Sequence, residues 1–595
     1  MHDPRAVLEE RLAARRGRVA ALERRDARIA LARLAAFGAL VAVGVGALAL
    51  HRFSAAWLAA PGAAFLALVA AHDGALRSLA RARRAVAFHE AGLARLDGRW
   101  AGTGDGGARY ASDEHPYARD LDLFGEGSLF ELLCTARTRP GADALAAWLL
   151  APASAPEARA RQRAVAELSP RLDLREDLAV LGEDVRADVH AERLTAWGAA
   201  PRLLRAWLTL PAAAVAIAAV AALAGWLSQA LHPIALVPAV GLEWALLRAL
   251  RDRIGAVLGG VERPGAELAV LAQLLARLER EPLEDARLRE LQARLAGAGR
   301  GRAAASSRIG ALGRIVERAG WADNQLFAPI AFLLGWRLQA ALAVERWRAA
   351  HGREIGRWLS ASAELEALSS LAAHAFLRPQ DPFPELVDAG AVYEGEGLAH
   401  PLLPDDRAVP NDVRLGPGVR LLVVSGSNMS GKSTLLRTVG ANAVLALAGA
   451  PVRARRLRLA PLQPGATLRI QDSLAEGRSR FWAEISRLRL IMDLAARPPA
   501  ALFLLDELLA GTNSRDRRIG AEAVLRALAG RGAIGLVTTH DLALSELVPA
   551  LGEAANAHFE DEVRDGDVVF DYRLRPGVAT HSNALALMRA VGLEV

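Results

Sequence analysis

The chain has 595 residues, enough for roughly three or four domains, with a hydrophobic fraction of 52% and a formal net charge of +7. That hydrophobic fraction is high for a purely soluble protein, so membrane segments have to be considered, while the small net charge supports polyanion binding only weakly. The single cysteine, Cys134, excludes an internal disulfide and a metal cluster built from cysteines alone.

The N-terminal region combines a charged helix with an apolar hairpin. Residues 5–33 are dense in Arg, Glu, Ala and Leu, which is typical of a solvated helix, and we expect no cleavable signal peptide. Two uncharged stretches follow, at 34–50 and 55–71. Each spans about 25 Å as a helix, slightly less than a hydrocarbon core of roughly 30 Å. The pattern predicts a first transmembrane hairpin over 34–74.

A second apolar hairpin is predicted over 201–250. Its arms are Ala206–Leu227 and Pro233–Leu247, and Glu243 lies inside the second arm. Arginines flank the outer ends of both hairpins, whereas the two tight turns contain a single arginine, Arg52. The positive-inside rule then predicts a bacterial-type inner membrane protein with its N-terminus, core and C-terminal domain in the cytoplasm. The alternative is that these segments are core helices of an alanine-rich protein.

Soluble segments separate and follow the hairpins. The composition predicts a charged N-terminal helix at 1–33, a cytoplasmic helix and linker at 75–120, a helical segment at 121–200, long helices at 251–400 and a nucleotide-binding domain at 401–595. In the last segment short apolar strands alternate with helices, which is typical of an α/β domain. The predicted fold is an α/β P-loop ATPase domain joined to an all-α domain, with two transmembrane helical hairpins.

The segment Gly426–Thr434 fits the phosphate-binding pattern G-x-x-x-x-G-K-[ST]. Its residues are Gly426, Ser427, Asn428, Met429, Ser430, Gly431, Lys432, Ser433 and Thr434. An apolar strand is expected before it and a helix after it, so that loop amides and a helix N-terminus face the phosphates. Lys432 is the only lysine among the 73 lysine and arginine residues. Its compact ammonium can reach between β- and γ-phosphates, where a planar guanidinium fits poorly. The segment predicts binding of a nucleoside triphosphate.

Two carboxylates end another apolar strand, at 501–505. Asp506 and Glu507 follow it directly. Beside a P-loop, the first carboxylate is expected near Mg²⁺ together with the Ser433 hydroxyl. The second can orient or deprotonate the attacking water. These residues predict hydrolysis of the triphosphate as well as its binding.

Two further segments complete the predicted site. A strand at 533–537 leads to His540, whose ring is expected to sense the γ-phosphate. Between the loop and the paired acids, the segment 470–481 has a Gly-Arg-Ser centre, and its Ser479 hydroxyl suits an anion. By itself, such a turn is more often an ordinary polar loop.

Together these motifs resemble the MutS family of DNA-repair ATPases. Gly426–Thr434 looks like the family's G-P-N-M-x-G-K-S-T, the segment 472–481 is similar to D-D-L-A-x-G-R-S-T-F, and 506–512 is similar to D-E-x-x-x-G-T. Residues 138–152 resemble the start of the family's helical core domain, and His400 matches the x-G-x-x-H-P at the end of that core. The likeness is dense over 401–595 and thinner before it.

The resemblance implies ATP and Mg²⁺ as cofactors and a homodimer with shared ATPase sites. Lys432 and the loop amides would hold the phosphates, while Ser433 and Asp506 would hold Mg²⁺. Glu507 would act on water, and His540 would read the γ-phosphate. Ser479 would contact the nucleotide bound to the other subunit, and long helices at 251–400 would carry the motion toward DNA or the membrane.

The chain also departs from the family pattern. Ser427 replaces the usual proline, Ser430 the usual glycine and Arg480 the usual threonine. We find no counterpart of the N-terminal mismatch-reading domain, so the resemblance does not extend to classical mismatch recognition. The function we expect is a membrane-tethered MutS-like ATPase that binds DNA. The alternatives are a membrane scaffold or signalling ATPase that uses ATP-dependent dimerisation, and an ABC-type transporter, although the chain has no Leu-Ser-Gly-Gly-Gln signature.

Overall fold

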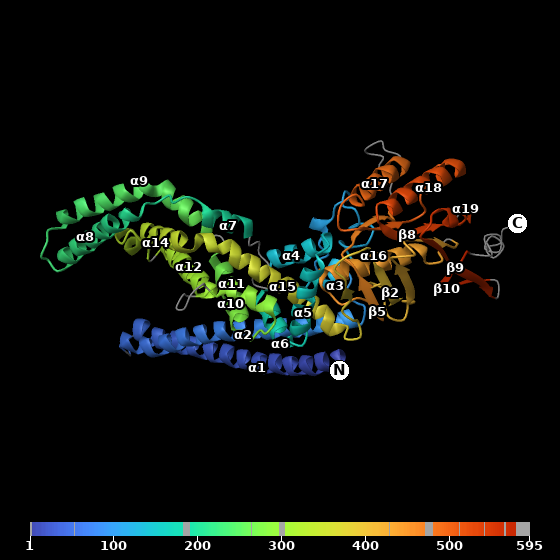
Figure 1. Cartoon of the computed structure of the whole chain (residues 1–595). Helices are drawn as coiled ribbons and strands as arrows, with labels where there is room; N and C mark the ends of the chain where they lie inside the picture. The colour runs from blue at the N-terminus through green and yellow to red at the C-terminus, as the bar shows by residue number, and fades with distance from the viewer. Residues whose placement is uncertain are drawn as a thin grey trace.

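The computed structural model has β-sheets at one end and two helical hairpins that extend away from them (Figure 1). The structure describes residues 3–50, 52, 54–182, 191–262, 265–296, 304–325, 327–427, 429–469, 480–510, 512–540, 542–564 and 567–578. Asn428 and Ser479, both predicted to contact a nucleotide, lie outside these ranges. The fold is mostly helical, with mixed α/β sheets in the C-terminal region.

The first hairpin consists of α1 (Pro4–Gly44) and α2 (Ala59–Leu96), which pack side by side. Asp3 caps α1, because its carboxylate accepts a hydrogen bond from the Arg5 amide. The charged helix and the first apolar stretch, predicted as separate elements, form one continuous helix. No proline follows Pro4 within α1 to interrupt it. A π-helical turn (Val45–Ala49) and a 3₁₀ turn (Ala55–Leu58) lie between the two arms.

The segment after α2, predicted as the linker part of 75–120, is folded against the rest of the protein. It contains a 3₁₀ turn (Ala108–Tyr110), and Tyr117 is 2% exposed. The Asp120 carboxylate accepts hydrogen bonds from the Leu468 and Arg469 amides at 2.7 and 2.8 Å. Its glycines and aspartates indicated turns, but contacts such as those of Tyr117 and Asp120 hold the segment between the helical core and the sheet.

The helical core surrounds α15 (Ile355–Leu377), most of whose side chains are buried. This helix packs against α4, α5 and α11. The other described core helices are α3 (Leu129–Leu133), α4 (Arg139–Leu150), α5 (Ala155–Leu168), α6 (Leu172–Gly182), α7 (Ala191–Ala199), α10 (Gly265–Arg280), α11 (Ala286–Leu295), α12 (Ala305–Gly320), α13 (Ala328–Leu333) and α14 (Trp336–His351). Short 3₁₀ turns at Ala206–Leu208, Pro233–Ala235, Trp321–Asp323, Gly352–Glu354 and Val548–Ala550 connect or extend helices.

The second hairpin consists of α8 (Thr209–Leu227) and α9 (Leu236–Glu262). Among the described residues, four helical segments are long and apolar enough to cross a membrane: Pro4–Leu48, Ala56–Leu96, Ala206–Leu227 and Pro233–Gly260. In their most apolar windows only 6, 6, 28 and 11% of residues are buried. Leu210 and Ile234, for example, are 80% and 70% exposed. These segments are therefore not core helices, which was the alternative left open by the sequence.

The C-terminal region contains two sheets. The smaller has the order β1-β5-β2-β3, with β1 (Glu385–Leu386), β2 (Tyr393–Leu398), β3 (Asn411–Leu415) and β5 (Arg456–Leu459). The larger has the order β10-β9-β4-β8-β7-β6, with β4 (Leu421–Ser425), β6 (Gln463–Thr467), β7 (Ala501–Leu505), β8 (Ile534–Thr539), β9 (Ala554–Arg564) and β10 (Asp567–Pro576). All adjacent pairs in the larger sheet are parallel except β9 and β10.

Helices cover both faces of the larger sheet. Alternate side chains of β4 enter two different cores: Leu422 and Val424 pack with α16 (Lys432–Ala448), whereas Leu421 and Val423 pack with α17 (Arg480–Leu494) and α18 (Ser514–Gly530). The short helix α19 (Leu542–Ser545) follows β8. Because β4, β7 and β8 are parallel neighbours buried on both sides, the loops after them meet at one edge. This edge contains the predicted site.

Candidate functional site

The phosphate-binding pattern forms a turn between a strand and a helix. β4 ends at Ser425, and α16 begins at Lys432. Gly431 has φ of +103°, a region that glycine enters without steric cost, and a Cβ there would lie 3.1 Å from the Tyr572 ring. Met429 also has a positive φ, +69°, and its side chain is 84% exposed. The loop thus turns sharply enough to start α16 directly behind it.

Lys432 lies within this turn and is only 5% exposed. Its Nζ donates hydrogen bonds to the carbonyl oxygens of Gly426 and Ser427, at 2.7 and 2.6 Å. Burial lowers the pKa of the ammonium, while the charges of Glu507 and Asp506 oppose that shift. The ammonium is therefore held at the centre of the loop, with the two carboxylates close enough to act on it electrostatically.

Asp506 connects the loop to the ends of two strands. Its Oδ2 accepts a hydrogen bond of 2.5 Å from the Ser433 hydroxyl, and its Oδ1 accepts one from the Thr538 hydroxyl. The Glu507 amide in turn donates to the Thr538 oxygen at 3.1 Å. Thr538 at the end of β8 thus fixes both acids, a role that the sequence did not reveal. The available signal was a hydroxyl at the carboxyl end of a wholly apolar strand.

Glu507 lies in a left-handed backbone conformation, with φ of +48°. Such a conformation costs free energy for a residue with a side chain, and it is common at functional sites. The Glu507 Oε1 lies 3.3 Å from the His540 Nδ1. His540 therefore contacts the second acid, and its own ring is not part of the cavity wall described next.

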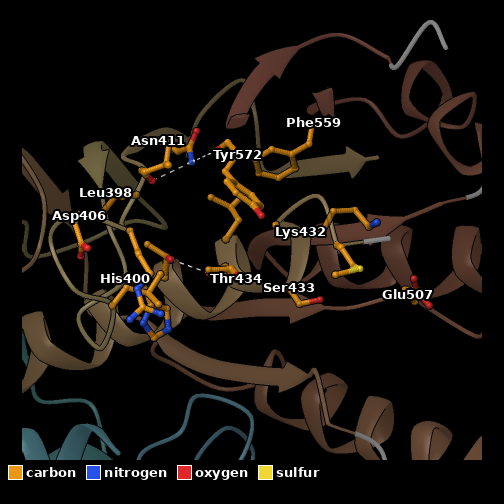
Figure 2. Close-up of a pocket in the computed structure, with 17 residues that line it drawn as sticks. Leu398, His400, Asp406, Asn411, Lys432, Ser433, Thr434, Glu507, Phe559 and Tyr572 are labelled. Atoms are coloured by element: carbon orange, nitrogen blue, oxygen red, sulfur yellow. Dashed lines mark hydrogen bonds between the residues drawn. The ribbon is translucent and has the colours of Figure 1, made fainter. Parts of the chain in front are cut away.

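A cavity of about 700 Å³ joins these groups to the smaller sheet (Figure 2). Lys432, Ser433 and Glu507 lie at one end of it and His400, Asp406 and Asn411 at the other, with Tyr572 and Phe559 between them. Of the predicted residues, Met429, Gly431 and Thr434 also line it. The sequence predicted the phosphate end of this cavity but not its far wall, because that wall comes from strands distant in sequence.

Asn411 and His400 characterise the far wall, the end of the cavity away from Lys432. Asn411 binds the bulge in β10: its Nδ2 donates to the Tyr572 carbonyl at 2.9 Å, and its Oδ1 accepts from the Leu574 amide at 2.7 Å. Burial, together with the nearby charges of Arg437 and Arg453, lowers the pKa of His400 to about 4. The His400 ring is therefore neutral at physiological pH and offers a flat, largely apolar face.

Comparison with known proteins adds an independent line of evidence. Residues 422–594 match the family model of MutS domain V. The chain is 34% identical over 289 residues to DNA mismatch repair protein MutS 2 of Halobacterium salinarum and to DNA mismatch repair protein MutS of Natronomonas pharaonis, covering 47% of this chain and 31% of each relative. It is 36% identical over 218 residues to DNA mismatch repair protein MutS 2 of Haloarcula marismortui, covering 33% of this chain and 23% of that protein.

Residues 422–594 thus resemble MutS domain V. The MutS domain V match begins inside β4 and includes the turn around Lys432 and both acids. It does not include either apolar hairpin or the wall formed by His400 and Asn411. The chain spans about a third of the length of the first two MutS relatives.

The donors at this site fit Mg²⁺. Ser433 and Asp506 supply a hydroxyl and a carboxylate, the hard oxygen ligands that this ion prefers. Within the described ranges, no group of three or more His, Cys, Asp and Glu side chains is arranged to hold a metal. Mg²⁺ is commonly held by one or two carboxylates together with substrate phosphates, and this donor set suits that mode.

Proposed function

We propose that this protein binds and hydrolyses ATP with Mg²⁺ at the cavity around Lys432. The proposal rests on one observation. The Lys432 ammonium, in the turn after β4, lies beside the carboxylates of Asp506 and Glu507, which follow β7. Lys432 and the loop amides bind the β- and γ-phosphates. Ser433 and Asp506 hold Mg²⁺, which would neutralise phosphate charge when bound.

Glu507 orients the attacking water and accepts its proton, and His540 positions the Glu507 carboxylate. The rest of the nucleotide extends along the cavity toward Tyr572, Phe559 and His400, whose rings can pack against a base. A cavity of about 700 Å³ is within the range of ordinary cofactor sites.

The decisive experiment compares Glu507→Gln with Lys432→Ala in the full chain. Glu507→Gln should bind ATP as tightly as the wild type and hydrolyse it at least 100-fold more slowly, since the amide cannot accept the proton. Lys432→Ala should lose ATP binding. Wild-type turnover by Glu507→Gln would refute the role of this acid, and normal ATP binding by Lys432→Ala would refute the site.

A second copy of this chain is the proposed partner of the ATPase domain. The face formed by α17 and α18 exposes large apolar side chains, including Trp482 at 58% and Ile519 at 59%. Met429, in the loop before α16, is also exposed. In the proposed homodimer, Ser479 of one subunit contacts the ATP of the other. Sedimentation with and without ATP tests this: a chain that stays monomeric with ATP would contradict it.

DNA is the proposed macromolecular ligand. The relatives carry the name DNA mismatch repair protein, and α11 and α12 expose several arginines that could contact phosphates: Arg289, Arg294, Arg314 and Arg318. We expect binding of homoduplex or branched DNA that weakens steeply with salt. Filter binding with homoduplex, mismatched and branched DNA, with and without ATP, provides the test, and salt-independent retention would contradict it.

We also propose that the four apolar helices anchor the protein in the inner membrane. Both hairpins extend away from the sheets in the same general direction, so one bilayer could receive both (Figure 1). Beside the second hairpin, the indole rings of Trp321 and Trp336 stack at 6.2 Å, and Trp321 is 51% exposed, as suits a membrane–water interface. The core and ATPase domain then lie in the cytoplasm. Release of the full chain from membranes by alkaline carbonate would refute the anchor.

A further inference from the structure

A second cavity lies between the first hairpin and the helical core. Its volume is about 620 Å³. Its wall is formed by α1, α2, the loop after α2, the start of α4, α6 and the end of α15. None of its lining residues also lines the cavity around Lys432. The two cavities are therefore separate sites.

Positive charge dominates the wall of this second cavity. Its lining includes six arginines: Arg84, Arg95, Arg109, Arg137, Arg139 and Arg175. The only carboxylate in the described lining is Asp105, which is already paired with Arg109 at 2.9 Å. Within the described lining, six guanidinium groups thus accompany one carboxylate.

Two acids, Glu131 and Glu366, lie behind the wall, and their charges act on Arg95 and Arg137 respectively. Glu131 accepts hydrogen bonds from the Gly104 and Gly127 amides, at 2.9 and 2.8 Å. Glu366 accepts from the Thr138 amide and hydroxyl and from the Arg137 amide. Burial raises the pKa of Glu366, while the bonds from Thr138 lower it. The Glu366 contacts fix the start of α4, and backbone amides occupy the Glu131 oxygens, so in the described part of the chain neither carboxylate forms an ion pair with an arginine of the wall.

Arg175 is the most unusual member of the wall. It is 6% exposed, and its guanidinium lies 4.7 Å from the centre of the Phe376 ring. It donates to the Ser169 carbonyl at 2.6 Å, but its Nε has no hydrogen-bond partner among the described residues. Burial lowers its pKa to about 9. A cation buried without a counter-ion is costly, so an anion in the cavity would stabilise it.

We propose that this cavity binds a small phosphate ester from solution, with its phosphate on the arginines. Guanidinium forks match phosphate oxygens in geometry and charge. The rings of Phe88 and Phe376 supply an apolar surface for the organic part of the ligand. A lipid headgroup is disfavoured, because Arg84 lies thirteen residues beyond the apolar stretch that ends at Ala71, or about 20 Å along α2.

A ligand held here would contact three parts of the molecule at once. Arg84 and Arg95 belong to α2, Arg139 begins α4 and Arg175 belongs to α6. The ester would therefore tie the end of the first hairpin to the helical core. This role does not depend on ATP hydrolysis at the other site.

Calorimetric titration of the full chain in detergent tests the proposal. Lys432→Ala serves as the background, so that the P-loop site does not contribute, and the probes are AMP, inorganic pyrophosphate and short-chain phosphatidic acid. We expect AMP or pyrophosphate to bind once per chain. Arg139→Gln, at an exposed position without an ion pair in the described structure, should weaken that binding about tenfold.

Two further variants make the test specific. Arg175→Lys keeps the charge but not the guanidinium fork, and it should also weaken binding. Arg99→Gln removes a nearby exposed arginine that pairs with Asp97 and does not line the cavity, so it should bind like the background. Three results would overturn the proposal: no binding of AMP or pyrophosphate, binding unaffected by both Arg139→Gln and Arg175→Lys, or binding of phosphatidic acid alone.

Discussion

The Ser433 hydroxyl donates a hydrogen bond of 2.5 Å to Asp506 Oδ2, across 73 residues of sequence. This bond joins the start of α16 to the end of β7. It brings together the two oxygen ligands that Mg²⁺ would need beside a triphosphate. The other Asp506 oxygen is held by Thr538, so that three elements converge on one carboxylate.

Thr538→Val should impair hydrolysis without removing the P-loop. The substitution leaves Asp506 Oδ1 without its donor and the Glu507 amide without its acceptor. We expect kcat to fall about tenfold or more and the Mg²⁺ requirement to rise, with a loss of about 1–3 kcal/mol in stability. Steady-state hydrolysis over a Mg²⁺ series measures this. Thr538→Ser should restore the wild-type values, and an unchanged Mg²⁺ dependence in Thr538→Val would contradict the assignment.

Lys432→Arg should lose ATP affinity, although all the other lysine or arginine positions of this chain are arginines. Lys432 is 5% exposed and its ammonium binds two carbonyl oxygens, where a wider planar guanidinium cannot fit without moving the loop. We expect ATP affinity to fall at least 100-fold while circular dichroism stays native. Retention of wild-type affinity would show that charge alone suffices at this position.

Gly431→Ala should disturb the cavity for two reasons: the positive φ of residue 431 and the close approach of the new Cβ to the Tyr572 ring. Both Gly431 and Gly418 have positive φ, +103° and +91°, so alanine costs about 1 kcal/mol or more at either position. At Gly431 the new Cβ would also approach the Tyr572 ring at 3.1 Å, whereas at Gly418 nothing lies within 4 Å. We expect similar losses in Tm but a loss of ATP binding in Gly431→Ala alone. Equal ATP affinities would argue against Tyr572 as a cavity wall.

Glu176 should make the attachment of the first hairpin acid-sensitive. Burial raises the pKa of this carboxyl, but hydrogen bonds from His89 and Arg15 outweigh that effect and lower the pKa to about 2, from an ordinary 4.5. A lowered carboxyl pKa contributes stability above the unfolded value, and that stability is lost as pH falls from 4.5 toward 2. The shift corresponds to about 3 kcal/mol.

The test is the Tm of wild type and Glu176→Gln between pH 3 and pH 7. Glu176→Gln should be less stable at pH 7, and the difference should shrink as the pH falls below 4.5. Asp173→Asn provides a control, since Asp173 lies on α6 like Glu176 and pairs with Arg11 of α1, but is 69% exposed. A constant difference between wild type and Glu176→Gln at all pH values would contradict the assigned ion pairs.

The sequence predicted those parts of the site that lie within short, contiguous motifs. The turn around Lys432 and the pair Asp506–Glu507 each consist of neighbouring residues with a fixed chemical task. Thr538, Asn411 and Tyr572 were not predicted, because each acts on residues far away in the chain through a single hydrogen bond or ring contact. The predicted contributions of Asn428 and Ser479 lie outside the residues that the structure describes.

By itself, the sequence determined the α/β character of the C-terminal region, the glycine-rich turn around Lys432 and the presence of four apolar helices, since local periodicity and short motifs specify such features. Tertiary structure alone decided that α1 is one unbroken helix, that the segment before the core is packed rather than extended, and that six arginines from distant segments share one cavity. The physical reason is that burial and charge excess depend on which segments pack together, and a one-dimensional pattern does not contain that information.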